Sequence, residues 1–168
     1  MQAIEVLNTS SPGEFADGVK PLFETAPPLA NVLYVARPYS SYAALIDTAE
    51  SLTRSMPLED QVAVLSAHPR IGANPTTLSA ASYREQAHST EVGMDPDELR
   101  KLYTELADLN DLYEQRFGFR FVVFVNGRSK SEILGVLRAR LDRTRAEELE
   151  TGLRDMFLIA RARLAAAT

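Results

Sequence analysis

The sequence contains two histidines, and one of them lies where acid–base chemistry is possible. His68 ends a predicted helix and directly precedes Pro69, which disfavours helical backbone at the residue before it. The chain therefore turns here, and a pocket can open beside the imidazole. The helix C-terminus favours the imidazolium and should raise its pKa above about 6.5, as suits a proton donor at neutral pH. The alternative is that His68 only caps the last carbonyl groups of the helix.

The second histidine and the nearby acidic residue give weaker signals. His88 lies in a polar run, where we expect a solvated side chain, and a metal-dependent hydrolase built from His68, His88 and carboxylates fits no common ligand spacing. Ser82 precedes Glu85 and Gln86 by three and four residues and shares their helix face. That face either points at a polar ligand or forms an exposed turn, and the residues alone favour the exposed turn.

An arginine near the end of the sequence lies among apolar residues. At about 100° per residue, Arg163 falls between Met156 and Ile159 on the last predicted helix, whereas Arg161 lies on the opposite flank. A guanidinium that projects along an apolar stripe needs either a route to water or an anionic partner. That partner is either an anionic substrate or a buried glutamate, and the sequence leaves the three possibilities open.

Helices position these residues, because apolar side chains recur every three or four positions through most of the chain. Capping signals mark where the helices begin. The expected starts are Ser11-Pro12-Gly13-Glu14, Ser40 or Ser41, Pro57, Ser79, Asp95-Pro96, Ser129 and Thr144, and the longest helix is expected to end at Gly118.

The segment from Phe119 to Val125 differs from the rest. It is rich in β-branched and aromatic residues, as a strand would be, but no other segment could pair with it. A lone strand is unstable, so we expect a buried, irregular core segment. The sequence therefore predicts an all-α bundle of seven or eight helices forming a single domain over residues 1–168.

The composition narrows the possible functions. The chain has 168 residues, 45% hydrophobic and 24% charged, a net charge of −5 and no cysteine. These values argue against nucleic-acid partners, and the absence of cysteine excludes disulfides and thiolate chemistry. No apolar run is long enough to span a bilayer, and no Walker, dinucleotide-binding or serine-hydrolase motif occurs. We expect a cytoplasmic protein without a membrane partner.

Four motifs occur in a characteristic order, preceded by Arg37-Pro38-Tyr39. They are Ala67-His68-Pro69-Arg70-Ile71-Gly72, Ser82-Tyr83-Arg84-Glu85-Gln86, the run from Leu109 to Val122, and Ile159-Ala160-Arg161-Ala162-Arg163-Leu164. Their order and separations resemble the 2-oxo-4-hydroxy-4-carboxy-5-ureidoimidazoline (OHCU) decarboxylase family over essentially the whole chain. The sequence departs from the family pattern between Ala87 and Met94, which leaves the local shape of the site open.

The resemblance implies a fold, an activity and partners. It implies an all-α carboxy-lyase that converts OHCU to (S)-allantoin, the last step of urate degradation. It also implies that no metal or organic cofactor is needed, that the chain forms a homodimer, and that the upstream hydroxyisourate hydrolase is a functional partner. The alternative is a non-catalytic helical interaction module, which would present residues 117–124 as an exposed apolar patch.

The resemblance also assigns roles to residues. His68, Glu85 and Arg163 take the places of the catalytic histidine, glutamate and arginine, and we expect the three side chains to meet in one small cavity. The residues implied to bind the substrate are Pro69, Ser82, Tyr83, Arg84, Gln86, Phe119, Arg120, Phe121, Val122 and Val123.

Overall fold

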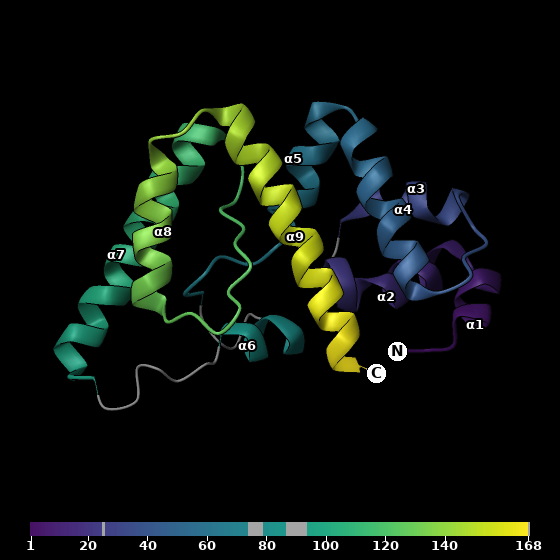
Figure 1. Ribbon diagram of the computed structural model, residues 1–168, viewed down its shortest axis with the longest axis horizontal. Helices are drawn as coiled ribbons and strands as arrows, with labels where there is room; N and C mark the ends of the chain where they lie inside the picture. Colours follow the sequence, from purple (N-terminus) through teal and green to yellow (C-terminus); the bar gives the residue numbers. More distant parts are fainter. Residues whose placement is uncertain (25, 74–78, 87–93, 168) are drawn as a thin grey trace. The chain divides into compact units, whose positions relative to one another are not determined.

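A computed structural model describes residues 1–24, 26–73, 79–86 and 94–167, except for the side chains at 80, 81 and 85. These residues form nine α-helices and no β-strand, which confirms the all-α prediction (Figure 1). The helices are α1 (Ile4–Thr9), α2 (Pro12–Phe23), α3 (Pro27–Val35), α4 (Tyr42–Ser55), α5 (Leu58–Ser66), α6 (Ala80–Gln86), α7 (Pro96–Phe117), α8 (Lys130–Leu141) and α9 (Arg145–Ala167).

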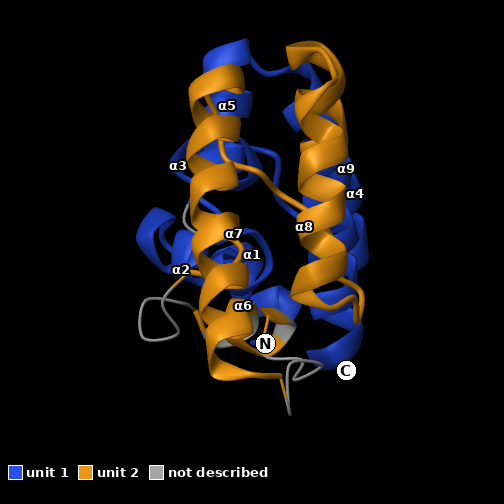
Figure 2. Ribbon diagram, turned by 90° about the vertical axis from the view of Figure 1, so that its left-hand side faces the viewer, with its two compact units in different colours: residues 1–68, 153–168 blue, residues 69–152 orange. Residues whose placement is uncertain are grey.

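The chain divides into two compact units, which Figure 2 distinguishes by colour. Unit 1 contains residues 1–68 and 153–168, and unit 2 contains residues 69–152. The first boundary falls between His68 and Pro69, and the second falls within α9. None of the helices in the described part combines the length and apolar character that a membrane crossing requires.

Helices begin where the capping signals predict. The Ser11 hydroxyl accepts from the Glu14 amide, and the Glu14 carboxylate accepts from the Ser11 amide at 2.9 Å, which completes a capping box. Ser129 and Glu132 form a second box at the start of α8. The caps of α4, α6 and α7 are those predicted as well: Ser41, Ser79 and Asp95.

Two helices were not predicted, and one helix end is displaced. The sequence pattern does not predict α1, which has no side-chain cap, and it indicates only an apolar segment where α3 forms. The helix expected to run to His68 ends at Ser66 instead, and the His68 amide donates to the Leu65 carbonyl at 3.1 Å. His68 therefore lies in the turn after α5.

Unit 1 has a core centred on α3, which packs against α2, α4 and α5. The apolar stripe of α9 also lies in this core, where the rings of Phe157 and Phe23 meet edge to face at 6.2 Å. Arg37, before Tyr39, stacks on the Tyr34 ring and donates to the carbonyls of Asn8 and Ser10. This motif therefore ties the turn after α3 to the end of α1 and to the residue that follows it.

Unit 2 buries the segment that resists helix formation. Residues 119–125 form neither helix nor strand, and Phe119, Phe121, Val122 and Val123 are buried, as predicted. The Tyr113 ring of α7 meets the rings of Phe119 and Phe121 at 6.1 and 5.2 Å. The burial of these side chains contradicts the exposed apolar patch that the interaction-module alternative requires.

A buried ionic network fixes this segment. The Glu148 carboxylate is fully buried and accepts from the Tyr113 hydroxyl at 2.6 Å and from Arg140 Nε at 2.7 Å. Arg140 Nη1 also donates to the Val122 carbonyl at 3.0 Å, and its guanidinium lies over the Phe121 ring. Burial and the adjacent carboxylate raise the pKa of Tyr113, which keeps its hydroxyl a donor.

Replacing Arg140 with Ala should lower the free energy of unfolding by about 3 kcal/mol, at the lower end for a broken buried pair, because the buried Glu148 carboxylate still pairs with the more exposed Arg143 at 3.1 Å. R138A is the matched control on the same helix. It removes an exposed pair with Glu105 and should cost less than about 1 kcal/mol. Urea denaturation measures both values, and equal losses would contradict the role given to Arg140.

Candidate functional site

The His68 side chain is buried at the start of the turn after α5, with 3% of its surface exposed. Two charged side chains of unit 1, Arg163 and Glu24, interact electrostatically with its imidazole. Arg163 comes from the apolar stripe of α9, and Glu24 directly follows α2. We call these three residues the buried cluster.

Arg163 is paired with a buried glutamate. Its Nη2 atom lies 2.9 Å from Glu24 Oε1, and less than a tenth of either side chain is exposed. Its Nη1 atom donates to the carbonyls of Pro21 and Leu22, in the last turn of α2, at 3.4 and 3.3 Å. Of the three possibilities left open by the sequence, the structure thus shows the buried glutamate. Arg161 on the opposite flank forms exposed pairs with Asp47 and Glu50.

Glu24 is the member of the cluster that sequence reasoning missed. Its backbone has φ 58° and ψ −159°, a left-handed φ that residues with a side chain rarely adopt. The available signal was a charged residue directly after the apolar stripe of α2 and just before Pro27-Pro28. That signal places Glu24 at a helix end, but it does not reveal which residue faces it.

The prediction that the pKa of His68 is raised is wrong. Burial and the neighbouring positive charge of Arg163 lower the pKa of His68 to about 4, while Glu24 and the Val64 carbonyl oppose the shift. The helix C-terminus favours the imidazolium, but removing it from water beside a guanidinium costs more. The imidazole is therefore neutral at pH 7, which suits a proton acceptor.

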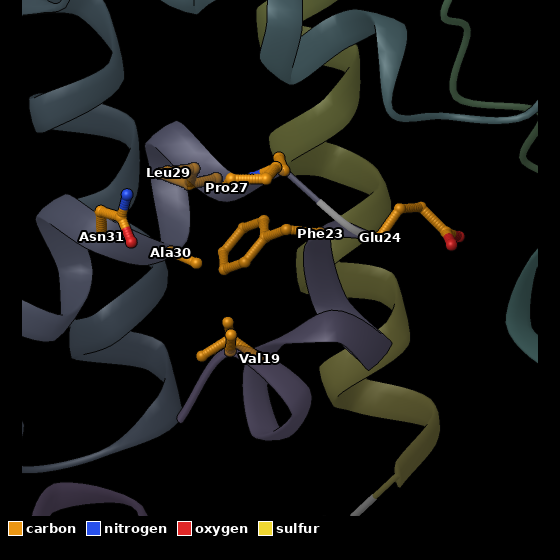
Figure 3. A pocket seen from close by; sticks show the side chains of 9 residues that line it. Val19, Phe23, Glu24, Pro27, Leu29, Ala30 and Asn31 are labelled. Carbon is orange, nitrogen blue, oxygen red and sulfur yellow. The ribbon is translucent and has the colours of Figure 1, made fainter. Parts of the chain in front are cut away.

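A cavity of about 120 Å³ lies next to the cluster in unit 1. Its lining is mainly apolar and includes Val19, Phe23 and Leu29. The Glu24 carboxylate points away from these side chains (Figure 3). Because anionic ligands need charged or polar partners, this cavity does not suit an anion.

The carboxylate among the predicted catalytic residues, Glu85, belongs to unit 2. Glu85 lies in α6, and its side chain is outside the description, as is the whole of His88. On the same helix Ser82 is buried, whereas Tyr83 and Arg84 are exposed. The structure therefore brings together two of the three predicted catalytic residues, His68 and Arg163.

Gln86 fixes the loop that follows Pro69. Its side-chain oxygen accepts from the Gly72 amide at 3.0 Å, and its side-chain nitrogen donates to the Arg70 carbonyl at 3.2 Å. Arg70 in turn forms a two-point contact with Glu114, with both distances 2.8 Å. The predicted binding residue Gln86 thus has a positioning role visible in unit 2.

The predicted binding residues 119–123 form part of the irregular segment of unit 2, whereas Pro69 is the first residue of unit 2 and is half-buried. Arg120 Nε lies 3.4 Å from the Glu114 carboxylate and is partly exposed, whereas the side chains on either side of it are buried. In the part of the chain that is described, no group of three acidic or histidine side chains could hold a metal ion. The metal-site alternative required His88, so it is not tested by these residues.

Comparisons with known proteins identify the family. A profile described as OHCU decarboxylase matches residues 8–165. The chain is 31% identical to the 2-oxo-4-hydroxy-4-carboxy-5-ureidoimidazoline decarboxylase of Haloferax volcanii, over 96% of this chain and 94% of that protein. It is 32% identical to the uric acid degradation bifunctional protein PucL of Bacillus subtilis, over 98% of this chain and 32% of PucL, so it spans about a third of that relative.

A solved structure agrees with this assignment. The fold is similar to a crystal structure of OHCU decarboxylase in the presence of (S)-allantoin, with a TM-score of 0.70 and 26% identity. The similarity covers 90% of this chain and 96% of the other. The fold is thus the all-α fold of the OHCU decarboxylases. The chain belongs to the OHCU decarboxylase family.

The lowered pKa of His68 makes stability depend on pH. Between pH 6.5 and about 4, the unfolded chain binds a proton at His68 that the native chain does not, so the free energy of unfolding falls as pH falls. His68 changes the free energy of unfolding by at most about 1.4 kcal/mol per pH unit, and above pH 6.5 it adds no dependence on pH. H68N should lack it, as urea unfolding of both proteins across this range would measure. Because His88 and the carboxylates occur in both chains, parallel pH curves would contradict the lowered pKa.

Proposed function

We propose that this chain catalyses the decarboxylation of OHCU to (S)-allantoin. The observation that carries the proposal is the buried cluster, in which a neutral imidazole adjoins a fixed guanidinium in a chain of this family. The family profile covers residues of both units, which supports the proposal that residues 1–168 act as one domain.

The reaction needs proton transfer and charge stabilisation from the protein. When the C4 carboxylate leaves as CO₂, the electron pair of the broken bond passes to the adjacent C5=N imine and gives an enaminol. The substrate thereby supplies its own electron sink. Protonation of the imine nitrogen takes one proton from water, and the enaminol then becomes allantoin as its 4-hydroxyl loses a proton and C5 gains one. The protein contributes positioning, electrostatics and a stereospecific proton delivery.

His68 can carry that proton because its imidazole starts neutral. In this proposal it accepts the proton of the 4-hydroxyl and returns a proton to C5 on one face. The negative charge of the bound substrate favours the imidazolium, so binding moves the pKa of His68 back towards neutrality.

The other assigned residues hold the substrate. Arg163 supplies positive charge to its polar acceptors, and Glu85 orients the ureido or ring N–H groups. A moderate grip on the departing carboxylate is favourable, because tight binding of the ground state would slow the reaction. The ten residues expected to line the site remain part of the proposal, with Gln86 acting at least through the loop that it fixes.

The test generates OHCU enzymatically from urate and follows circular dichroism. The chain should accelerate the appearance of the (S)-allantoin signal, because spontaneous decay gives the racemate. H68N and E85Q should each lower kcat/KM by at least about 100-fold, since each removes a group assigned to proton transfer or orientation. R163K should lower it as well, because Lys cannot reproduce the planar fork of donors.

Matched controls separate these roles from damage to the fold. H88N controls for H68N, and R161K controls for R163K, because Arg161 forms exposed pairs on the same helix. Both controls should retain activity. Wild-type protein that leaves the product racemic would favour the non-catalytic alternative, and H68N with full turnover would reject the role of His68.

We further propose a homodimer that acts in the cytoplasm together with the upstream hydroxyisourate hydrolase. The family resemblance supports the dimer, and two relatives named as uric acid degradation bifunctional proteins, each about three times as long as the matched region, support the link in urate degradation. Static light scattering should give twice the chain mass of 18.6 kDa, and a mass of one chain at working concentration would overturn the dimer.

A further inference from the structure

The Glu24 carboxylate makes the shortest contact described for the Arg163 guanidinium. The ion pair is 2.9 Å long, whereas the two carbonyl contacts from the end of α2 are 3.3 and 3.4 Å. A charged, nearly fully buried acceptor at this distance fixes a guanidinium more strongly than neutral carbonyls at longer range. The direction of Arg163 therefore depends on Glu24.

The backbone at Glu24 is unfavourable for a glutamate. Its φ of 58° is costly for a residue with a side chain, and its negative charge lies at the negative end of the α2 dipole. A glycine here would remove the first cost, and a neutral residue the second. Such strain persists where the surrounding structure compensates for it, and it occurs most often at functional sites.

Glu24 and Arg163 have opposite effects on the imidazole that they adjoin. The positive charge of Arg163 disfavours the imidazolium of His68, and the negative charge of Glu24 favours it. Among the described residues of unit 1, Arg163 on α9 and Glu24 after α2 are charged groups that shift the pKa of His68, and the neutral Val64 carbonyl of α5 also affects it. Removing one charge of the pair leaves the other uncompensated.

We propose that Glu24 is a positioning residue for the reaction, which orients Arg163 and balances its positive charge beside His68. The inference rests on the proposed decarboxylation. Without the Glu24 charge, Arg163 would bind the substrate carboxylate more tightly in the ground state, and His68 would become a weaker base. Both changes slow turnover without weakening substrate binding.

The first experiment is E24Q, which keeps the shape and an acceptor oxygen but removes the charge. Its kcat should fall at least about 10-fold while KM stays equal or falls. E50Q is the matched control, because Glu50 pairs with Arg161, an exposed arginine on α9, the helix that also carries Arg163. E50Q should leave kcat and KM unchanged.

The second experiment titrates His68 directly by NMR and does not depend on activity. H88Q identifies the His68 signal, because the chain has only two histidines. Relative to wild type, the midpoint should rise in R163Q and fall by about one pH unit in E24Q. If E24Q unfolds in acid, R163Q and E24Q/R163Q form a second pair, in which the added E24Q change should again lower the midpoint.

The possible results separate failure of the proposed decarboxylation from failure of the role given to Glu24. A wild-type protein that fails to accelerate (S)-allantoin formation overturns the proposed function, whatever the titrations give. An active wild type with unchanged kcat in folded E24Q, or with the same His68 midpoint with and without the Glu24 charge, overturns the role of Glu24. Lower stability in E24Q with an unmoved His68 midpoint and an unchanged kcat would likewise reduce Glu24 to a structural residue.

Discussion

The burial of a guanidinium beside an imidazole is the constraint on which unit 1 depends. A charge removed from water needs a partner of opposite sign with good geometry, and Glu24 supplies it at 2.9 Å. This pairing requires α2 to end at Phe23 and the backbone to turn through a left-handed φ at Glu24. The end of α2, the stripe of α9 and the turn after α5 must therefore be formed together.

Unit 2 also contains a buried ion pair, but this pair fixes backbone. Its buried pair, Arg140 and Glu148, lies among aromatic side chains and holds the Val122 carbonyl, so it fixes backbone that forms no regular element. Irregular buried backbone must find partners for its polar groups outside a helix or sheet ladder. One pair thus fixes a segment, whereas the other sets the electrostatics of a titratable group.

Local features were predictable, and distant partnerships were not. Ser11, Asp95 and Ser129 act on amides two or three residues away, so their capping roles can be found from spacing alone. The burial of the segment after Gly118 followed from its lack of a pairing strand. The role of Glu24 was not predicted, because its partner Arg163 lies far away in the sequence. The pKa of His68 was predicted wrongly because the helix-end argument is local, whereas burial and Arg163 are not.

The neutral resting state of His68 fits the proton balance of the proposed reaction. Allantoin formation moves the 4-hydroxyl proton to C5, and the one proton consumed overall comes from water, so the imidazole needs no proton of its own at the start. A histidine held protonated by its surroundings would first have to lose a proton before it could act on the hydroxyl. Burial and the positive charge of Arg163 prevent that state before the substrate binds, and in the proposed reaction the negative charge of the substrate then permits it. Proton uptake at His68 is thereby linked to the presence of the molecule that must be deprotonated.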